Sequence, residues 1–295
     1  MNDAPVFGGY DRAALDAQYD NRKRHPEHVQ LHAAWTADGD KVLADFDHKL
    51  DIAYGPSADE TLDLYLPKKS QRAAKGAPIN VFLHGGYWMS RHKDHFRFLA
   101  RGLVPAGAIL VVVNYALVPA VDLDEQVRQC RAAVAWAWRH AEDLGGDRER
   151  VFVSGHSAGG HLTAMMLTTD WPAFEGGLPR TLVKGGAALS GIYDLEPIRH
   201  AYLQDTLKFT AAHETRNSPD RLAPATDAPL LVAVGDDESD EFLRQSKVLV
   251  AAWSNRLADC RLLVAPKLNH FTMLGAFADP GSALNAAVLR QMGLG

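Results

Sequence analysis

The segment around Ser157 has the residue types and the spacing of a serine nucleophile. Ser157 lies between Gly155 and Gly159, shortly after the apolar run Val151–Val153. A serine that must project from the edge of a sheet needs a sharp, strained turn, and only glycine lets neighbouring backbone approach such a turn closely. Gly-x-Ser-x-Gly also arises by chance, so the prediction depends on its context: a preceding strand and a helix expected over 158–169. We predict that Ser157 is a catalytic nucleophile.

A serine hydroxyl is a poor nucleophile at neutral pH and needs a base, an acid that orients the base, and donors for the oxyanion. The sequence supplies these groups in the chain order serine, acid, histidine. His270 follows the apolar run 261–265 and is the predicted base. The segment "VGDDESDEF" follows an earlier apolar run, and we predict its Glu238 as the acid. Clustered carboxylates usually mark a solvated loop, so most of the acids in this segment are expected to have no catalytic role. Asp237 and Asp236 remain the alternatives to Glu238.

The segment "HGGYW", residues 84–88, ends another apolar run and has the composition of an oxyanion loop. Successive backbone N–H groups in a glycine-rich turn can point together at a developing negative charge. Gly85 is expected to permit the turn, and His84 to brace it through hydrogen bonds. The predicted donors are the backbone N–H groups of Gly86, Tyr87 and Ala158.

Large side chains near the predicted strand ends are candidates for a substrate pocket: Trp88, Tyr193 and Phe271, together with the motif residues His84 and Gly85. The histidines do not predict a metal site. They recur at helical spacing at 25, 28 and 32 and again at 92 and 95, but no cysteine or carboxylate pattern completes a ligand set. We expect catalysis without a metal or a cofactor.

Apolar runs that alternate with helical patterns predict an α/β fold with a doubly wound, mostly parallel sheet and helices on both faces. The runs are "INVFLHGG", "AILVVVNYAL", "RVFVSG", "KGGAALSG", "APLLVAVG" and "CRLLVAP", and two alternating segments before them predict a hairpin. We expect one domain over residues 1–295, with an N-terminal arm at 1–45. The connection 193–226 is too long for an ordinary loop and is expected to form a small helical cap.

Composition narrows the classes of function. The chain has 31 Lys and Arg against 36 Asp and Glu, with no basic run to suggest a nucleic-acid partner. No stretch predicts a signal peptide or a membrane span, so we expect a cytoplasmic protein that does not bind membranes. Cys130 and Cys260 are too few for a disulfide framework. The expected partner is a small-molecule substrate, and a homodimer is left open.

These motifs together resemble the α/β-hydrolase type of kynurenine formamidase (arylformamidase). The resemblance covers most of the chain and rests on "HGGYW", "GHSAGGHL", "SGIYDLEP", "DDESDEFLRQS" and "NHF", with "AQYDNRKRHPEH" similar to the arm before the core. It implies Ser157 as nucleophile, Glu238 at the position of the acid and His270 as base. Glutamate replaces the aspartate of animal members. The implied reaction is hydrolysis of N-formyl-L-kynurenine to L-kynurenine and formate.

Two other functions remain as alternatives. The first is a carboxylesterase or arylesterase of broad specificity for short acyl chains, since one fold hosts many specificities. The second is a hydrolase-fold protein that binds a small ligand without turning it over. Such a protein would be expected to have lost a serine, acid or histidine, whereas all three candidates are present here.

Overall fold

The computed structural model describes residues 4–71, 73 and 75–295, and its centre is an eight-stranded sheet with the order β1-β2-β4-β3-β5-β6-β7-β8. The pairs β1–β2 and β2–β4 are antiparallel, and every other neighbouring pair is parallel. The strands are β1 (Asp47–Ala53), β2 (Thr61–Leu66), β3 (Ala77–Leu83), β4 (Ile109–Val113), β5 (Gly146–His156), β6 (Val183–Leu189), β7 (Leu230–Gly235) and β8 (Cys260–Ala265).

Helices connect most of the parallel strands, as expected for a doubly wound sheet. They are α1 (Arg12–Tyr19), α2 (Asn21–Arg24), α3 (His28–Asp45), α4 (Ala100–Leu103), α5 (Leu123–Arg139), α6 (Ala158–Leu167), α7 (Trp171–Phe174), α8 (Glu196–His200), α9 (Gln204–Leu207), α10 (Ala211–Asn217), α11 (Asp240–Trp253), α12 (Thr272–Ala278) and α13 (Ala283–Gln291). Three 3₁₀ helices are η1 (Lys69–Gln71), η2 (Lys93–Leu99) and η3 (Pro219–Arg221). No helix in the described ranges is long and apolar enough to cross a membrane.

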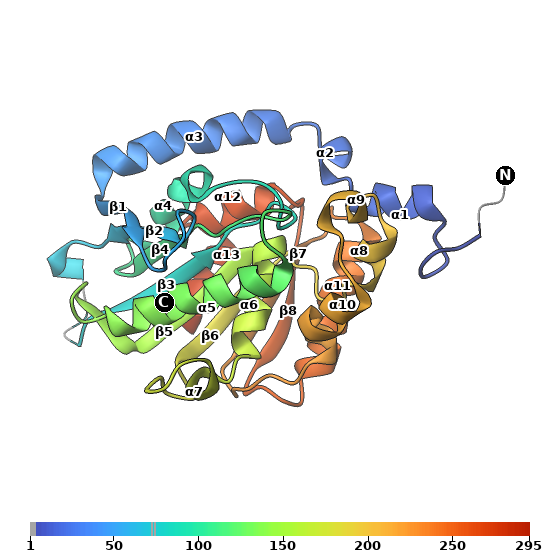
Figure 1. Ribbon diagram of the computed structural model, residues 1–295. Coiled ribbons are helices and arrows are strands. Elements are labelled where there is room, and N and C mark those ends of the chain that lie inside the picture. The colour runs from blue at the N-terminus through green and yellow to red at the C-terminus, as the bar shows by residue number, and fades with distance from the viewer. Residues whose placement is uncertain (1–3, 72, 74) are drawn as a thin grey trace.

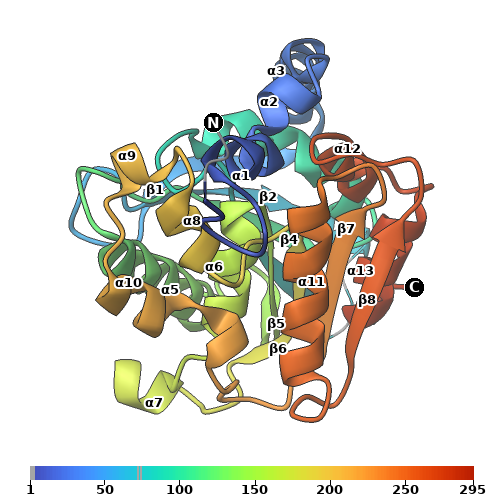
Figure 2. The same cartoon turned by 90° about the vertical axis from the view of Figure 1, so that its right-hand side faces the viewer.

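Each face of the sheet packs against its own set of helices and its own hydrophobic core (Figures 1 and 2). On one face, α5, α6 and α11 bury apolar side chains against the strands. Helix α5 packs on the sheet through one apolar stripe, which consists of the buried side chains of Leu123, Val127, Cys130 and Val134. Asp122 caps the start of this helix by accepting from the Glu125 N–H. The opposite face is covered by α3, η2, α4, α12 and α13. The α/β class expected from the sequence is confirmed.

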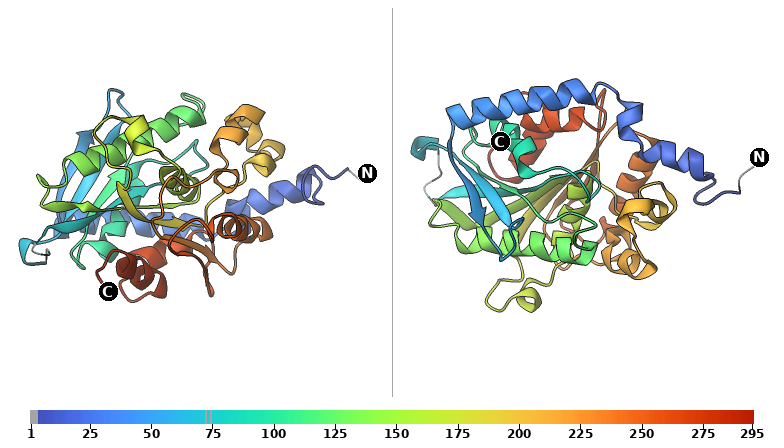
Figure 3. Two further views of the ribbon diagram at one scale, coloured as in Figure 1. Left: turned by 90° about the horizontal axis from the view of Figure 1, so that it is seen from below. Right: turned by 45° about the horizontal axis from the view of Figure 1, so that its top comes forward.

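Helix α1 and the segment 193–226 lie outside this sandwich and close to each other (Figures 1 and 3). The arm expected at 1–45 begins with residues 1–3, which lie outside the described residues, and continues as α1, α2 and α3. Helix α3 packs beside η2, and α1 packs beside α8 and α11. The segment expected as a cap, 193–226, contains α8, α9, α10 and η3.

The backbones of β3, β5 and α6 approach one another closely where the strands end. A Cβ built on Gly159 would lie 1.9 Å from the Leu83 carbonyl oxygen, and one on Gly155 would lie 2.2 Å from the Gly159 oxygen. A Cβ on Gly85 would lie 3.0 Å from the Ser157 Cβ. These three positions therefore require glycine, because any side chain would overlap a neighbouring segment. This explains the two glycines of the Gly-x-Ser-x-Gly pattern, Gly155 and Gly159.

We expect Gly159→Ala to destabilise the fold by about 2 kcal/mol or more, because its methyl group would overlap the carbonyl of β3. Urea unfolding followed by circular dichroism measures this. Gly275→Ala is the matched control: Gly275 lies inside α12 with no atom within 4 Å of its added Cβ, so this change should be neutral or stabilise by up to about 1 kcal/mol. Equal stability of the two variants would contradict the close-contact explanation.

Candidate active site

Ser157 lies at the turn between β5 and α6 in a strained conformation. Its φ of 59° and ψ of −122° fall in a region that residues with side chains rarely adopt. The Ser157 N–H donates to the Leu189 carbonyl of the neighbouring strand β6 at 2.9 Å, which holds the turn in place. The side chain is 3% exposed and lines a cavity.

His270 and Glu238 form a buried, hydrogen-bonded pair beside this turn. The Nδ1 of His270 lies 2.7 Å from Oε2 of Glu238, and the two residues are 4% and 3% exposed. The other carboxylate oxygen of Glu238 accepts from the Ser190 hydroxyl and from the Gly235 N–H. Since a carboxylate accepts only, the proton lies on Nδ1 of His270 and leaves Nε2 as an acceptor.

The alternative acids point elsewhere. Asp236 and Asp237 are exposed, and Asp236 accepts from the Lys267 N–H at 2.6 Å. Neither makes a hydrogen bond or an ion pair with His270 among the described residues. The geometry therefore favours Glu238 over both aspartates as the group that orients the histidine.

His270 is held from several sides, and it shares the cavity with Ser157. The ring of His156 donates to the His270 carbonyl at 2.7 Å, and the two rings are 4.5 Å apart. Phe242 also packs against the His270 ring, with the two ring centroids 4.6 Å apart. No hydrogen bond joins the Ser157 hydroxyl to His270 in the described part of the chain. Catalytic hydrogen bonds of this kind are often long before substrate binds.

The loop after β3 presents free backbone donors. Gly86 has a φ of 125° and Tyr87 a φ of 50°, so the backbone turns sharply at both positions. The N–H groups of Gly86, Tyr87 and Ala158 have no hydrogen-bond partner among residues 4–71, 73 and 75–295. These N–H groups, one of which lies at the start of α6, can stabilise a negative charge that develops on the oxygen of a carbonyl group attacked by Ser157.

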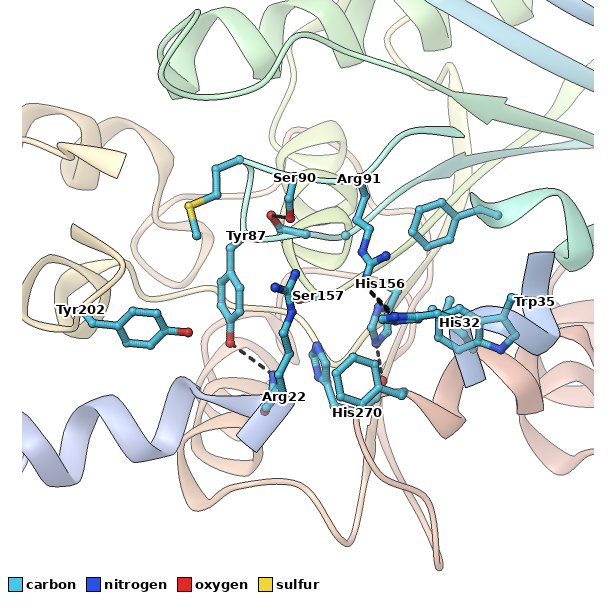
Figure 4. A pocket seen from close by; sticks show the side chains of 17 residues that line it. Arg22, His32, Trp35, Tyr87, Ser90, Arg91, His156, Ser157, Tyr202 and His270 are labelled. Carbon is cyan, nitrogen blue, oxygen red and sulfur yellow. Dashed lines mark hydrogen bonds between the residues drawn. The ribbon is translucent and has the colours of Figure 1, made fainter. Parts of the chain in front are cut away.

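A cavity of about 290 Å³ joins these groups and is shown in Figure 4. Its walls combine the predicted serine, histidine and loop residues with aromatic and cationic side chains. The lining residues are Asn21, Arg22, His32, Trp35, Gly85, Gly86, Tyr87, Met89, Ser90, Arg91, Phe96, His156, Ser157, Tyr202, His270, Phe271 and Leu274. Phe271 therefore lies where a pocket residue was expected.

Three residues expected in the pocket do not line it: His84, Trp88 and Tyr193, each fully buried. Tyr193 lies in the core beneath β6, where its hydroxyl donates to the Ala188 carbonyl at 3.4 Å.

His84 and Trp88 instead support the loop from below. The His84 ring stacks on Tyr115 at 4.2 Å, and its Nδ1 lies 2.9 Å from the Gly85 carbonyl. The Trp88 indole N–H donates to His161 at 3.2 Å, and the opposite nitrogen of that ring donates to the Asn217 carbonyl at 2.7 Å. Both histidines are therefore fixed as neutral tautomers that brace the motif.

The N-terminal arm forms one wall of the cavity, which the sequence pattern did not predict. The Tyr87 hydroxyl donates to the Tyr19 carbonyl at 2.6 Å and accepts from the Asn21 side chain at 3.2 Å. Asn21, Arg22, His32 and Trp35 then reach the cavity from α2 and α3. The only available signal was the match of "AQYDNRKRHPEH" to an arm, since this polar segment has no periodic core face.

In the described residues, one group has the arrangement to hold a metal ion: Asp122, Asp124 and His213. It lies on the surface, and Asp124 is already engaged by Arg216 and by the Asn217 side chain. None of the candidate catalytic residues belongs to this group.

Comparison with known proteins identifies the family and the fold of the chain. The BD-FAE family profile matches residues 62–252. The chain is 34% identical to the kynurenine formamidase of Danio rerio over 83% of this chain and 82% of that protein. A solved structure from Silicibacter sp. TM1040, provisionally named a thioesterase, is 30% identical, with a TM-score of 0.79 over 92% of this chain and 97% of its own. Esterase B from Lactobacillus rhamnosis shares the fold at 20% identity, with a TM-score of 0.70 over 92% and 95% of the two chains.

Buried histidines make the fold sensitive to acid. Burial lowers the pKa of His84 to about 3 and that of His161 to about 4, and it lowers the pKa of His156 as well. Below pH 6.5 these histidines bind protons in the unfolded chain but stay neutral in the folded protein. The free energy of unfolding therefore falls from pH 6.5 toward pH 4. The loss should be roughly 1 kcal/mol per pH unit for each histidine.

We expect His161→Gln, which can keep both hydrogen bonds without titrating, to lose less stability between pH 7 and pH 5 than the unmodified protein. Denaturant unfolding at several pH values measures the slope, with His48→Gln at an exposed site as the control. An identical slope in the His161 variant and the unmodified protein would show that this histidine does not carry the acid sensitivity.

Proposed function

The chain belongs to the BD-FAE family of α/β hydrolases and is 34% identical to the kynurenine formamidase of Danio rerio, and we propose that it cleaves N-formyl-L-kynurenine to L-kynurenine and formate through a serine triad. That the protein is a hydrolase enzyme follows from its relatives. The finer proposal rests on one arrangement: Ser157, His270, Gly86 and Tyr87 line one cavity, and His270 is paired with the buried Glu238. The backbone N–H groups of Gly86, Tyr87 and Ala158 are free among the described residues.

In the proposed reaction, Nε2 of His270 takes the proton of the Ser157 hydroxyl as its oxygen attacks the formyl carbonyl. The negative charge that develops on the carbonyl oxygen is stabilised by the N–H groups of Gly86, Tyr87 and Ala158. Protonated His270 gives its proton to the departing aryl amine, and a formyl ester remains on Ser157. Water, deprotonated by the same histidine, then releases formate and restores the serine.

Glu238 holds the imidazole in the tautomer that this reaction requires and stabilises its protonated form. Its hydrogen bonds to Ser190 and Gly235 keep the carboxylate in place without supplying a second positive charge. A glutamate suits this role as well as an aspartate does, since the hydrogen bond to Nδ1 is what orients the ring.

The cavity also suits an aryl substrate. Trp35, Phe96 and Phe271 line it with flat apolar side chains, and Tyr87 and Tyr202 line it as well. An arylesterase or short-chain carboxylesterase of broad specificity remains the second candidate, because ester and formamide carbonyls make the same demands on the triad. The esterase fold of Esterase B from Lactobacillus rhamnosis agrees with either substrate.

The test compares hydrolysis of N-formyl-L-kynurenine and 4-nitrophenyl acetate by the unmodified protein, Ser157→Ala, Glu238→Gln and Asp237→Asn. We expect kcat/KM above roughly 10⁴ M⁻¹s⁻¹ on the formamide. Ser157→Ala should lower kcat by roughly 10⁴-fold or more, and Glu238→Gln by roughly 10²-fold or more, because the histidine then loses its anionic partner.

Asp237→Asn is the matched control, since it removes an exposed carboxylate from the same loop and should retain activity. Loss of activity in this variant but not in Glu238→Gln would overturn the assigned acid. Cleavage of the ester alone would overturn the formamide substrate and favour the esterase. A protein that turns over neither compound would favour the ligand-binding alternative.

A further inference from the structure

Among the described residues, those that line the cavity beside Ser157 include two arginines and no acid. Arg22 comes from α2 in the N-terminal arm, and Arg91 comes from the segment between β3 and η2. Figure 4 shows the two side chains extending into the pocket from opposite sides. Two cations that face one cavity without a carboxylate produce a strong positive potential there.

Neither arginine is neutralised by the protein. Among the described residues no carboxylate forms an ion pair with Arg22 or Arg91, whereas most other arginines have such a partner. The two side chains are close enough for Arg22 to disfavour the charge on Arg91, because burial first and Arg22 second lower the pKa of Arg91. Like charges held together in this way are costly unless a ligand compensates them.

Arg91 is also held in position rather than left mobile. Its backbone has a φ of 82°, a left-handed conformation that non-glycine residues rarely adopt. One guanidinium nitrogen lies 3.0 Å from each ring nitrogen of His32. Burial, and then Arg91 itself, lower the pKa of His32 to about 4, so the ring is neutral at pH 7 and orients Arg91 without cancelling its charge.

The arm adds one unpaired acceptor to the same wall. Asn21 is 3% exposed and lines the cavity, and its Oδ1 has no hydrogen-bond partner within the described ranges. Its amide nitrogen is already used, because it donates to the Tyr87 hydroxyl. A buried acceptor without a donor costs stability, so a ligand with an N–H group would satisfy it.

We propose that Arg22 and Arg91 form a subsite for a carboxylate of the substrate, so that the enzyme selects acyl compounds with a negative charge on the leaving-group side. The inference rests on the proposed function in that Ser157 lies in the same cavity. Planar guanidinium groups bind carboxylates through paired hydrogen bonds, and Asn21 is placed to accept from an amino group on the same ligand. An amino-acid head group has both features.

The experiment uses two formamides that share the aryl ketone but differ in charge: N-formyl-L-kynurenine and N-(2-acetylphenyl)formamide, which lacks the amino-acid group. The readout is the ratio of kcat/KM on the first to kcat/KM on the second. We expect Arg22→Gln and Arg91→Gln each to lower this ratio by about tenfold or more, mainly through KM of the charged substrate. Arg91→Lys should restore part of the ratio.

Lys23→Gln is the matched control, because it removes an exposed positive charge from α2 one residue away from Arg22 and does not line the cavity. Its ratio should equal that of the unmodified protein. If the ratio fell as much in Lys23→Gln as in the arginine variants, the effect would be a general electrostatic attraction of the charged substrate. That result would overturn the subsite. Equal losses on both substrates in the arginine variants would indicate a structural role and would also overturn it.

Failure of the subsite can be told apart from failure of the proposed function. If the unmodified protein hydrolyses neither formamide, the formamidase proposal fails, and the same variants are tested on 3-acetoxybenzoate and phenyl acetate, which differ by one carboxylate. A ratio that falls in the arginine variants on this pair still supports the subsite. If both esters are cleaved and the ratio is the same in the arginine variants as in the unmodified protein, the subsite is overturned.

Discussion

Where β3 and β5 end, their backbones approach each other and the start of α6 more closely than side chains allow. Gly85, Gly155 and Gly159 meet this demand, and the turn that results holds Ser157 in a strained conformation at the edge of the sheet. The same close approach brings the loop after β3 beside the start of α6, so its free N–H groups lie on the cavity that Ser157 lines. The arrangement of donors and serine is therefore a property of the sheet edge.

Around this edge, charge is distributed unevenly. The carboxylate of Glu238 is engaged by the His270 ring, the Ser190 hydroxyl and the Gly235 N–H. The cavity is lined by the guanidinium groups of Arg22 and Arg91, and no acidic residue within the described ranges lines it. Tyr87 connects the two regions, since its backbone belongs to the donor loop and its hydroxyl bonds the arm. Tyr87 thus links the position of the arm to the shape of the donor loop.

Much of this was predictable from the sequence. Continuous apolar runs gave the parallel strands because strands buried on both faces cannot alternate, and strand ends then located Ser157, His270 and the glycine loop. The choice of Glu238 among neighbouring acids was open, since side-chain direction in a loop depends on contacts with distant segments. Tyr193 was misplaced because a large side chain near a strand end suits core and pocket alike. The contribution of the N-terminal arm to the cavity wall could not be predicted. A polar segment without hydrophobic periodicity does not show which of its faces packs against the rest of the protein.

The account's central claim is that Ser157 attacks a carbonyl whose oxygen is received by the loop after β3 and the start of α6. A crystal structure of the protein after reaction with a fluorophosphonate tests it most directly. The account predicts phosphorus bonded to the Ser157 oxygen, with the phosphoryl oxygen in hydrogen-bond distance of the N–H groups of Gly86, Tyr87 and Ala158. Modification of another residue, or a phosphoryl oxygen turned away from these donors, would contradict it.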